Sequence, residues 1–254
     1  MKKLILDKLH KLSGLHDIKI LYACESGSRA WGFPSPDSDY DVRFIYVHKP
    51  DWYLSLAEGK DTINLPIDEH ELDITGWELR KALRLLKKSN ASPLEWIQSP
   101  IVYRKVDGFR ERFSELSAAL FSPVAVAHHY HSMSLKYVAA CVGKEEVKLK
   151  SYFYALRTTL AVSWIRKMKV MAPIVFTDML SLAEAPVRQR IEELMELKSR
   201  ENESYLSASD KLIDKFLIDA AEANGTDIKE LGAGKGDFSA LDEFFIKTVK
   251  GEKL

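Results

Sequence analysis

The chain has 254 residues, a formal net charge of zero and 46% hydrophobic residues. These values are those of an ordinary globular protein, long enough for one large domain or two small ones. The neutral charge balance argues against bulk nucleic-acid binding, although a local basic groove remains compatible with it. No apolar run is long enough to cross a bilayer, so we expect no membrane partner. Cys24 and Cys141, the two cysteines, lie in apolar surroundings and predict buried thiols in a cytoplasmic protein.

The first half of the chain mixes strand-like and helix-like patterns, which predicts a small mixed sheet with helices around it. In chain order we expect a surface helix over 1–12, a strand over 18–23, a helical turn over 28–31, a strand over 40–47, a helical or loop insert over 52–56, paired strands over 61–67 and 69–75, a helix over 76–88, a short helix over 93–98 and a strand over 101–103.

The second half is helical from about residue 109, and Gly and Pro punctuation is sparse there. The main predicted helices cover 123–141, 148–169, 186–199 and 207–224. The change of pattern near residue 120 predicts an α+β fold in two parts, with an α+β domain over 1–120 and a helical domain over 121–254. The pattern assigns no clear structure to residues 232–254.

The stretch from Gly27 to Asp41 is the most informative part of the sequence. Gly27 and Ser28 follow an apolar strand, and ten residues after Ser28 the chain continues with Asp39 and Asp41. Residues at i and i+2 of a strand point to the same face, so the two carboxylates are expected side by side. Two such like charges repel each other, and a divalent cation between them relieves the repulsion.

These residue types suit the transfer of a nucleotidyl group. Carboxylate oxygens are ligands that Mg²⁺ prefers, and it binds few of them together with substrate phosphates. Backbone N–H groups at Gly27 and Ser28, with the Ser28 hydroxyl, suit phosphate oxygens. The alternative is a polar turn beside an exposed strand end, since acidic pairs are common on solvated faces. The combination with the Gly-Ser turn, between two apolar strands, favours the site.

A third carboxylate is expected from a neighbouring strand. Glu69, Glu71 and Asp73 alternate with apolar or aromatic residues and would line one face of the 69–75 strand. All three are alternatively the solvated face of an edge strand. We favour that explanation for Glu69 and the functional one for Asp73, which is expected at the end of the strand.

A Gly-Ser pair, ten residues and an Asp-x-Asp pair, followed by a carboxylate on another strand, resemble the DNA-polymerase-β-type nucleotidyltransferase superfamily. Within it, the sequence is similar to the predicted nucleotidyltransferases of the YcgL/RlaP type, which are associated with RNA repair. The matching segments are Gly27-Ser28-Arg29-Ala30-Trp31-Gly32-Phe33, Asp37-Ser38-Asp39-Tyr40-Asp41-Val42-Arg43-Phe44-Ile45-Tyr46, Leu72-Asp73-Ile74, Gly76-Trp77-Glu78-Leu79-Arg80-Lys81-Ala82-Leu83, Ser92-Pro93-Leu94-Glu95-Trp96-Ile97, Ser99-Pro100-Ile101-Val102-Tyr103 and Tyr152-Phe153-Tyr154-Ala155-Leu156-Arg157.

The resemblance implies a polymerase-β-like palm over residues 1–120 and a helical nucleotide- or substrate-binding domain over 121–254. It implies that Asp39 and Asp41 hold two Mg²⁺ ions, with Mn²⁺ as an alternative. It further implies that Asp73 holds the catalytic ion and favours deprotonation of the acceptor hydroxyl. Gly27 and Ser28 would contact the β- and γ-phosphates of an NTP.

The resemblance further implies a role for the helical domain, because such domains of related enzymes often supply a lysine and a tyrosine to the triphosphate and base. Lys150, Tyr154 and Arg157 fall at i, i+4 and i+7, one stripe of a helix, and are our candidates for this role. A solvated helix face is the alternative, and Lys148 replaces Lys150 if the helix is rotated. Beyond that stripe, Arg29 is a further candidate phosphate ligand, and Arg43 is expected to balance the carboxylates through salt bridges or to bind phosphate.

The function implied is transfer of NMP from an NTP to a hydroxyl with release of pyrophosphate. ATP is the expected donor because it is the usual donor in the superfamily. An RNA end is the first choice of acceptor because the family is associated with RNA repair. Two alternatives stay open. The first is adenylylation of a protein, as in minimal nucleotidyltransferase antitoxins, and the second is a nucleotide-binding regulatory module without turnover. The sequence indicates no oligomeric state.

Overall fold

The computed structural model describes residues 1–226, 228–234 and 237–253. The chain forms two compact units, and each is built from separate segments of the sequence. Unit 1 comprises Met1–Gly27, Asp39–Leu120 and Lys235–Leu254, and unit 2 comprises Ser28–Ser38 and Phe121–Gly234. The loop Ser28–Ser38 thus belongs to unit 2, although the residues directly before and after it belong to unit 1. The functional division at residue 120 stays a prediction.

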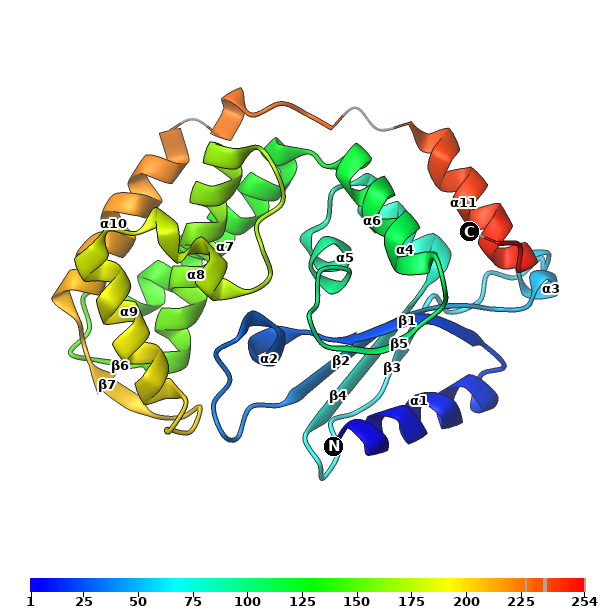
Figure 1. The fold of residues 1–254 in the computed structure, drawn as a ribbon, viewed down its shortest axis with the longest axis horizontal. Helices are drawn as coiled ribbons and strands as arrows, with labels where there is room; N and C mark the ends of the chain where they lie inside the picture. The colour runs from blue at the N-terminus through cyan, green and yellow to red at the C-terminus, as the bar shows by residue number, and fades with distance from the viewer. Residues whose placement is uncertain (227, 235–236, 254) are drawn as a thin grey trace. The chain divides into compact units, whose positions relative to one another are not determined.

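Unit 1 contains a five-stranded sheet and the helices that cover it (Figure 1). Its elements are α1 (Lys2–Leu15), β1 (Lys19–Glu25), β2 (Tyr40–Val47), α3 (Pro50–Tyr53), β3 (Thr62–Asn64), β4 (Leu72–Glu78), α4 (Leu79–Lys87), α5 (Ala91–Trp96), β5 (Val102–Lys105), α6 (Phe109–Leu120) and α11 (Phe238–Lys250), and the short helix α2 (Gly27–Trp31) begins at its edge.

The strand order of the sheet is β3-β4-β2-β1-β5, and the sheet is mixed. Strand β2 runs parallel to β4 and antiparallel to β1, while β3 and β5 form antiparallel edges. The predicted α+β class with a small mixed sheet is therefore confirmed. Among its strands, β2 covers the residues predicted for it.

Alternation along β2 decides which side chains enter the core. Val42, Phe44 and Tyr46 belong to one buried cluster with Ile5 and other residues of α1. Figure 1 shows α1 on one face of the sheet, with α4 and α6 on the other. The alternate residues of β2, which include Asp41 and Arg43, consequently point to the face away from α1.

Unit 2 is mainly helical, with one small two-stranded sheet that pairs β6 with β7. Its elements after the 28–38 segment are α7 (Pro123–Cys141), β6 (Glu146–Lys148), α8 (Leu149–Met168), the 3₁₀ helix η1 (Phe176–Leu182), α9 (Ala185–Lys198), β7 (Leu206–Ala208), α10 (Lys211–Thr226) and the 3₁₀ helix η2 (Ile228–Glu230).

Buried hydrogen bonds between helices help to order the core of unit 2. The hydroxyls of Ser134 on α7 and Thr159 on α8 lie 2.6 Å apart in a hydrogen bond. Asn224 on α10 donates to the Thr159 carbonyl at 3.0 Å. Because buried polar groups are costly unless paired, these contacts fix how α7, α8 and α10 align.

Several predicted boundaries are wrong, including those of the strands expected over 61–67 and 69–75, which cover Thr62–Asn64 and Leu72–Glu78. The helix predicted over 76–88 begins only at Leu79, because β4 continues to Glu78 and the Glu78 carboxylate caps the helix by accepting from the N–H groups of Arg80 and Lys81. Asp73 therefore lies near the beginning of its strand instead of near its end. In unit 2, the helix predicted from Ser207 begins at Lys211, since Ser207 pairs with Val147 in the small sheet.

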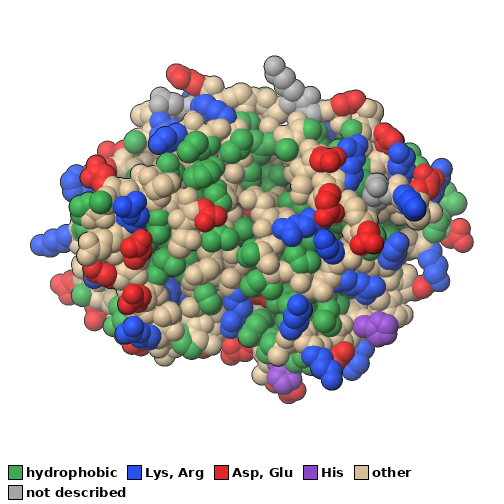
Figure 2. All heavy atoms as spheres, viewed as in Figure 1, with side chains coloured by type: hydrophobic (Ala, Val, Ile, Leu, Met, Phe, Trp, Pro, Cys, Tyr) green, Lys and Arg blue, Asp and Glu red, His purple; other side chains and the backbone are tan. Residues whose placement is uncertain are grey.

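Acidic and basic side chains are interspersed over the face drawn in Figure 2, in keeping with the net charge of zero. Among the described residues, no helix combines the length and the apolar character needed to span a membrane. Both cysteines are buried and free, and burial raises the pKa of the Cys24 thiol to about 12.

Gly76→Ala tests the packing between β2 and β4. A Cβ at Gly76 would lie 2.1 Å from Cζ of Phe44, its partner across the two strands, and that ring is completely buried. We expect the variant to lose about 1–3 kcal/mol of unfolding free energy in urea titrations, because the ring cannot move without disturbing the core. Gly14→Ala in α1 is the control: nothing lies within 4 Å of its Cβ, and it should be neutral or stabilising. Equal effects of both changes would contradict this account.

Candidate active site

The parallel register of β2 and β4 brings two of the predicted carboxylates together. Asp41 lies directly opposite Asp73 in the register. The guanidinium of Arg43 lies between them: Nη2 donates to Oδ1 of Asp41 at 2.8 Å and to Oδ2 of Asp73 at 2.7 Å. Its Nη1 also donates to the carbonyl of Asp73 at 2.8 Å. The salt-bridging role considered for Arg43 is present, and it offsets the repulsion of the two carboxylates.

The turn after β1 holds the backbone and side chain of Asp41. The Asp41 N–H donates to the buried carboxylate of Glu25 at 2.8 Å, and the Asp41 carbonyl accepts from Ser26 N–H at 2.8 Å. Gly27 has a φ of +61°, and a Cβ there would lie 1.9 Å from Oδ2 of Asp41. Only glycine leaves room for this carboxylate, so the Gly27 of the motif and Asp41 form one local structure.

The donor set fits a divalent cation only in part. Within the residues that the structure describes, no three His, Cys, Asp or Glu side chains are grouped so as to hold a metal ion. Asp41 and Asp73 do converge on one cation, the Arg43 guanidinium, and both keep about a quarter of their side-chain surface exposed. Two carboxylates suffice for Mg²⁺ when phosphates and waters complete its shell. Asp39 lies half-buried just before β2, and its participation stays a prediction.

The predicted phosphate ligands of unit 2 gather around Trp31. The guanidinium carbon of Arg157 lies 4.0 Å from the centre of the Trp31 ring, and Tyr154 packs edge-on against the same ring at 5.3 Å. Arg157 is only 4% exposed, which excludes a solvated helix face at that position. Lys150 has its ammonium 5.9 Å from the centre of the Tyr154 ring. One stripe of α8 thus does present a lysine, a tyrosine and an arginine as a connected group.

The other two candidates lie in the 28–38 segment of unit 2. The Ser28 side chain is mostly buried, and its carbonyl accepts from the N–H groups of Gly32 and Phe33 at 3.1 Å each. Arg29 donates to the carbonyl of Ser38 at 2.7 Å. Arg29 thereby closes the loop that leads to Asp39, whereas a phosphate-binding role for either residue stays a prediction.

Lys198 and Glu203, which no sequence motif indicates as site residues, anchor this loop within unit 2. Lys198 is 2% exposed and donates to the Ser35 hydroxyl at 2.8 Å. Glu203 accepts from the Ser38 hydroxyl at 2.8 Å and from the ammonium of Lys150. Burial lowers the pKa of Lys198. Burial would raise the pKa of Glu203, but hydrogen bonds from Lys150 and Ser38 outweigh it, and that pKa is lowered.

Sequence signals for these extra residues were weak. Glu25 ends an apolar strand directly before the Gly-Ser turn, a position where a charged residue is conspicuous. Its partners, the Asp41 N–H and the Tyr103 hydroxyl, come from strands on either side of β1, so no local pattern indicates them. Lys198 and Glu203 lie more than 160 residues from the loop they hold.

A family model described as "RNA repair pathway DNA polymerase beta family" (RlaP) matches residues 1–247 of the chain. The chain belongs to the RlaP family. This assignment confirms the resemblance inferred from the sequence and places the chain among enzymes of the nucleotidyltransferase type. The motif residues that carry the resemblance include Gly27, Asp41 and Asp73, which the tight turn and the parallel register bring together.

One relative in the RlaP family is the uncharacterized protein YcgL of Bacillus subtilis (strain 168). It is 44% identical over 253 residues, which cover 98% of this chain and 97% of that protein. Among solved structures, a nucleotidyltransferase-like protein from Exiguobacterium sibiricum aligns over 98% of this chain and 81% of that chain. Its TM-score is 0.32 at 9% identity, a likeness too weak to show a shared fold.

Gly27→Ala tests the contact between the turn and Asp41. We expect a loss of about 2–4 kcal/mol of unfolding free energy, because the change adds a clash with the carboxylate to the cost of a positive φ. Gly32→Ala is the matched control, since Gly32 also has a positive φ but its Cβ would meet nothing closer than Val175 at 4.0 Å. Chemical denaturation of both variants measures the difference. A Gly27 variant no less stable than the Gly32 variant would refute the clash.

Glu203→Gln tests the loop anchor through pH. A carboxyl whose pKa is lowered on folding stabilises the protein above its unfolded pKa of about 4.3, and the stabilisation is lost as pH falls through the folded value. The melting temperature of the variant should therefore lie below that of the parent at pH 7, and the gap should close toward pH 3. Glu222→Gln, an exposed change on α10, should show no such pH-dependent gap. A gap that is constant with pH would argue against an ionised Glu203 in the anchor.

Proposed function

We propose that the chain transfers a nucleoside monophosphate from an NTP, with ATP as the donor, to a hydroxyl, and releases pyrophosphate. The acceptor we infer is an RNA end. The observation that carries the proposal is the pair formed by Asp41 and Asp73 on adjacent parallel strands, with a cationic group between their carboxylates. Such a pair, next to a Gly-Ser turn, suits a reaction in which negative charge gathers on phosphates.

The residues have separable roles in this proposal. Gly27 leaves space for the Asp41 carboxylate, and Ser28 donates to the outer phosphates so that the pyrophosphate leaves in line. Asp73 lies beside the acceptor hydroxyl and favours removal of its proton. Lys150, Tyr154 and Arg157, with Arg29, bind the triphosphate and the base. Binding by Lys150 would require it to exchange its present carboxylate partner for a phosphate.

Asp41 and Asp73 would hold Mg²⁺, or Mn²⁺ in its place, with Asp39 as the third ligand. When bound, the metal would neutralise charge on the triphosphate. Arg43 supports this assignment, because the atoms that a cation would bind already face a guanidinium. The choice of RNA rests on the name of the family, and the buried, free cysteines support a cytoplasmic setting.

Asp41→Asn should abolish transfer while leaving the fold intact. We expect the rate to fall on the order of 100-fold or more, because one carboxylate of the pair becomes neutral and its electrostatic contribution is lost. The assay supplies α-labelled NTPs and Mg²⁺, with and without RNA, and follows the label. Asp7→Asn, the same chemical change at an exposed position of α1, should keep full activity.

The destination of the label separates the proposal from its rivals. Label on RNA supports the proposed acceptor, and label on protein would replace it with protein adenylylation. Binding of NTP with no transfer to either would indicate a regulatory module. Full activity of the Asp41 variant would overturn the assignment of the carboxylate pair.

A further inference from the structure

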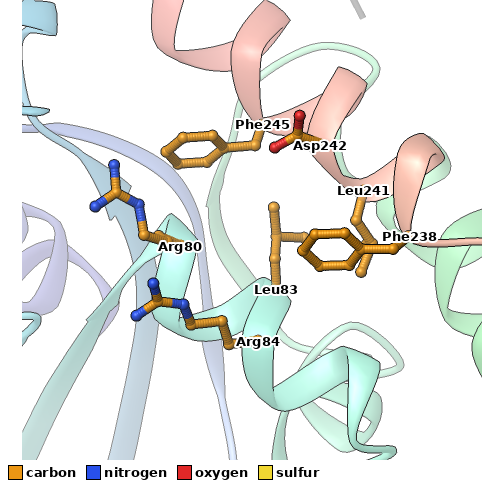
Figure 3. Close-up of a pocket in the computed structure, with 7 residues that line it drawn as sticks. All are labelled: Arg80, Leu83, Arg84, Phe238, Leu241, Asp242 and Phe245. Atoms are coloured by element: carbon orange, nitrogen blue, oxygen red, sulfur yellow. The ribbon is translucent and has the colours of Figure 1, made fainter.

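Helices α4 and α11 of unit 1 line an open hollow of about 240 Å³, and neither Asp41 nor Asp73 is among its lining residues. Figure 3 shows that its lining residues come from both helices, with Leu83 pointing toward α11 and with Arg80 and Arg84 extending to the side, away from the backbone of α11. The lining residues are Arg80, Leu83 and Arg84 from α4, and Phe238, Leu241, Asp242 and Phe245 from α11. We call this hollow the α4–α11 groove.

The α4 side of the groove is strongly basic. The helix buries Leu79, Ala82, Leu83 and Leu86 and turns its charged residues outward. Arg84 and Lys87 are exposed, and Lys88 follows at the end of the helix. A helix with several cations on its outer face is an electrostatic footprint for a polyanion, even in a chain of zero net charge.

The α11 side supplies two aromatic rings that are at least partly exposed. Phe238 is 49% exposed, and the ammonium of Lys87 lies 3.9 Å from the centre of its ring. Phe245 lies partly exposed, with the guanidinium carbon of Arg80 5.1 Å from its ring centre. Exposed rings beside cations form a platform on which nucleobases stack while phosphates pair with the charges.

We propose that the α4–α11 groove binds single-stranded RNA. A base stacks on Phe238, and flanking phosphates pair with Arg84 and Lys87. Asp242 accepts a hydrogen bond from an exocyclic amino group, which a base supplies and an acidic peptide does not. The preference for RNA over other nucleic acid rests on the proposed function, but the binding itself does not require turnover.

The groove and the carboxylate pair are connected through one strand. Asp73 lies near the start of β4, and Glu78 ends it about 17 Å farther on, at about 3.3 Å per residue. Helix α4 begins at the next residue. The groove therefore holds a part of the RNA strand some nucleotides away from the end that reacts.

Fluorescence anisotropy with the full chain and a labelled single-stranded RNA of about 12 nucleotides tests this inference. We expect Arg84→Glu to weaken binding about 10-fold or more and to lower the slope of log K against log salt by about 1 or more. Phe238→Ala should weaken binding about 5- to 100-fold, the value of one lost stacking contact. Lys11→Glu makes the same charge change as Arg84→Glu at an exposed position of α1, and should bind like the parent.

Three results would overturn the inference: no RNA binding by the parent chain, equal weakening by Arg84→Glu and Lys11→Glu, or unchanged affinity in Phe238→Ala. Polyglutamate that competes as well as unlabelled RNA would assign the groove to an acidic protein instead. AMP that competes mole for mole would assign it to a free nucleotide.

Asp41→Asn separates this inference from the proposed function. That variant should bind RNA with the affinity of the parent even though transfer is lost. If the parent chain transfers no label but binds RNA in a way that the groove variants weaken, the proposed reaction is refuted and the inference about the groove is supported. If the groove variants change neither the transfer of label to RNA nor the RNA affinity, the proposed reaction is supported and the inference about the groove is refuted.

Discussion

The candidate site depends on one interaction, the bridge that the Arg43 guanidinium makes between the carboxylates of Asp41 and Asp73. It exists only because β2 and β4 are parallel and pair Asp41 with Asp73. A slip of one residue would turn every side chain of a strand to the opposite face. Packing of Val42 and Phe44 in the cluster with α1 prevents that slip, since it would remove both from the cluster and turn Asp41 and Arg43 into it. The hydrophobic core thus fixes the geometry of the polar site.

A second constraint acts on the segment between the Gly-Ser turn and Asp39. Its residues belong to unit 2, where Lys198 and Glu203 anchor it through Ser35 and Ser38. A lysine as buried as Lys198 is costly unless it is paired, so the anchor resists rearrangement. The same Glu203 accepts from Lys150, and one carboxylate therefore connects the loop to the stripe of α8 that we assign to the nucleotide.

One strand positions both the carboxylate pair and the α4–α11 groove, the two functional surfaces assigned to unit 1. Strand β4 carries Asp73 near its start and passes directly into α4, whose N-terminus is capped by Glu78. A rigid strand separates the carboxylate pair from the basic helix, and the fold itself sets the spacing. The net charge of zero gives no indication of the basic helix α4, because its cations are balanced by carboxylates elsewhere in the chain.

Local pattern in the sequence determined the α+β class, strand β2 with its two faces, and the association of the Gly-Ser turn with Asp41. These follow from short-range periodicity and from the family motif. Local pattern did not predict where β4 ends. The strand continues past Gly76 to Glu78 because it pairs with its neighbours there, and Glu78 then caps α4. Only the tertiary structure decided that Asp73 faces Asp41 across a guanidinium, that Glu25 holds Asp41, and that Lys198 holds the loop. Each of those contacts joins separate elements of the chain, and no local sequence pattern encodes which distant residues will meet.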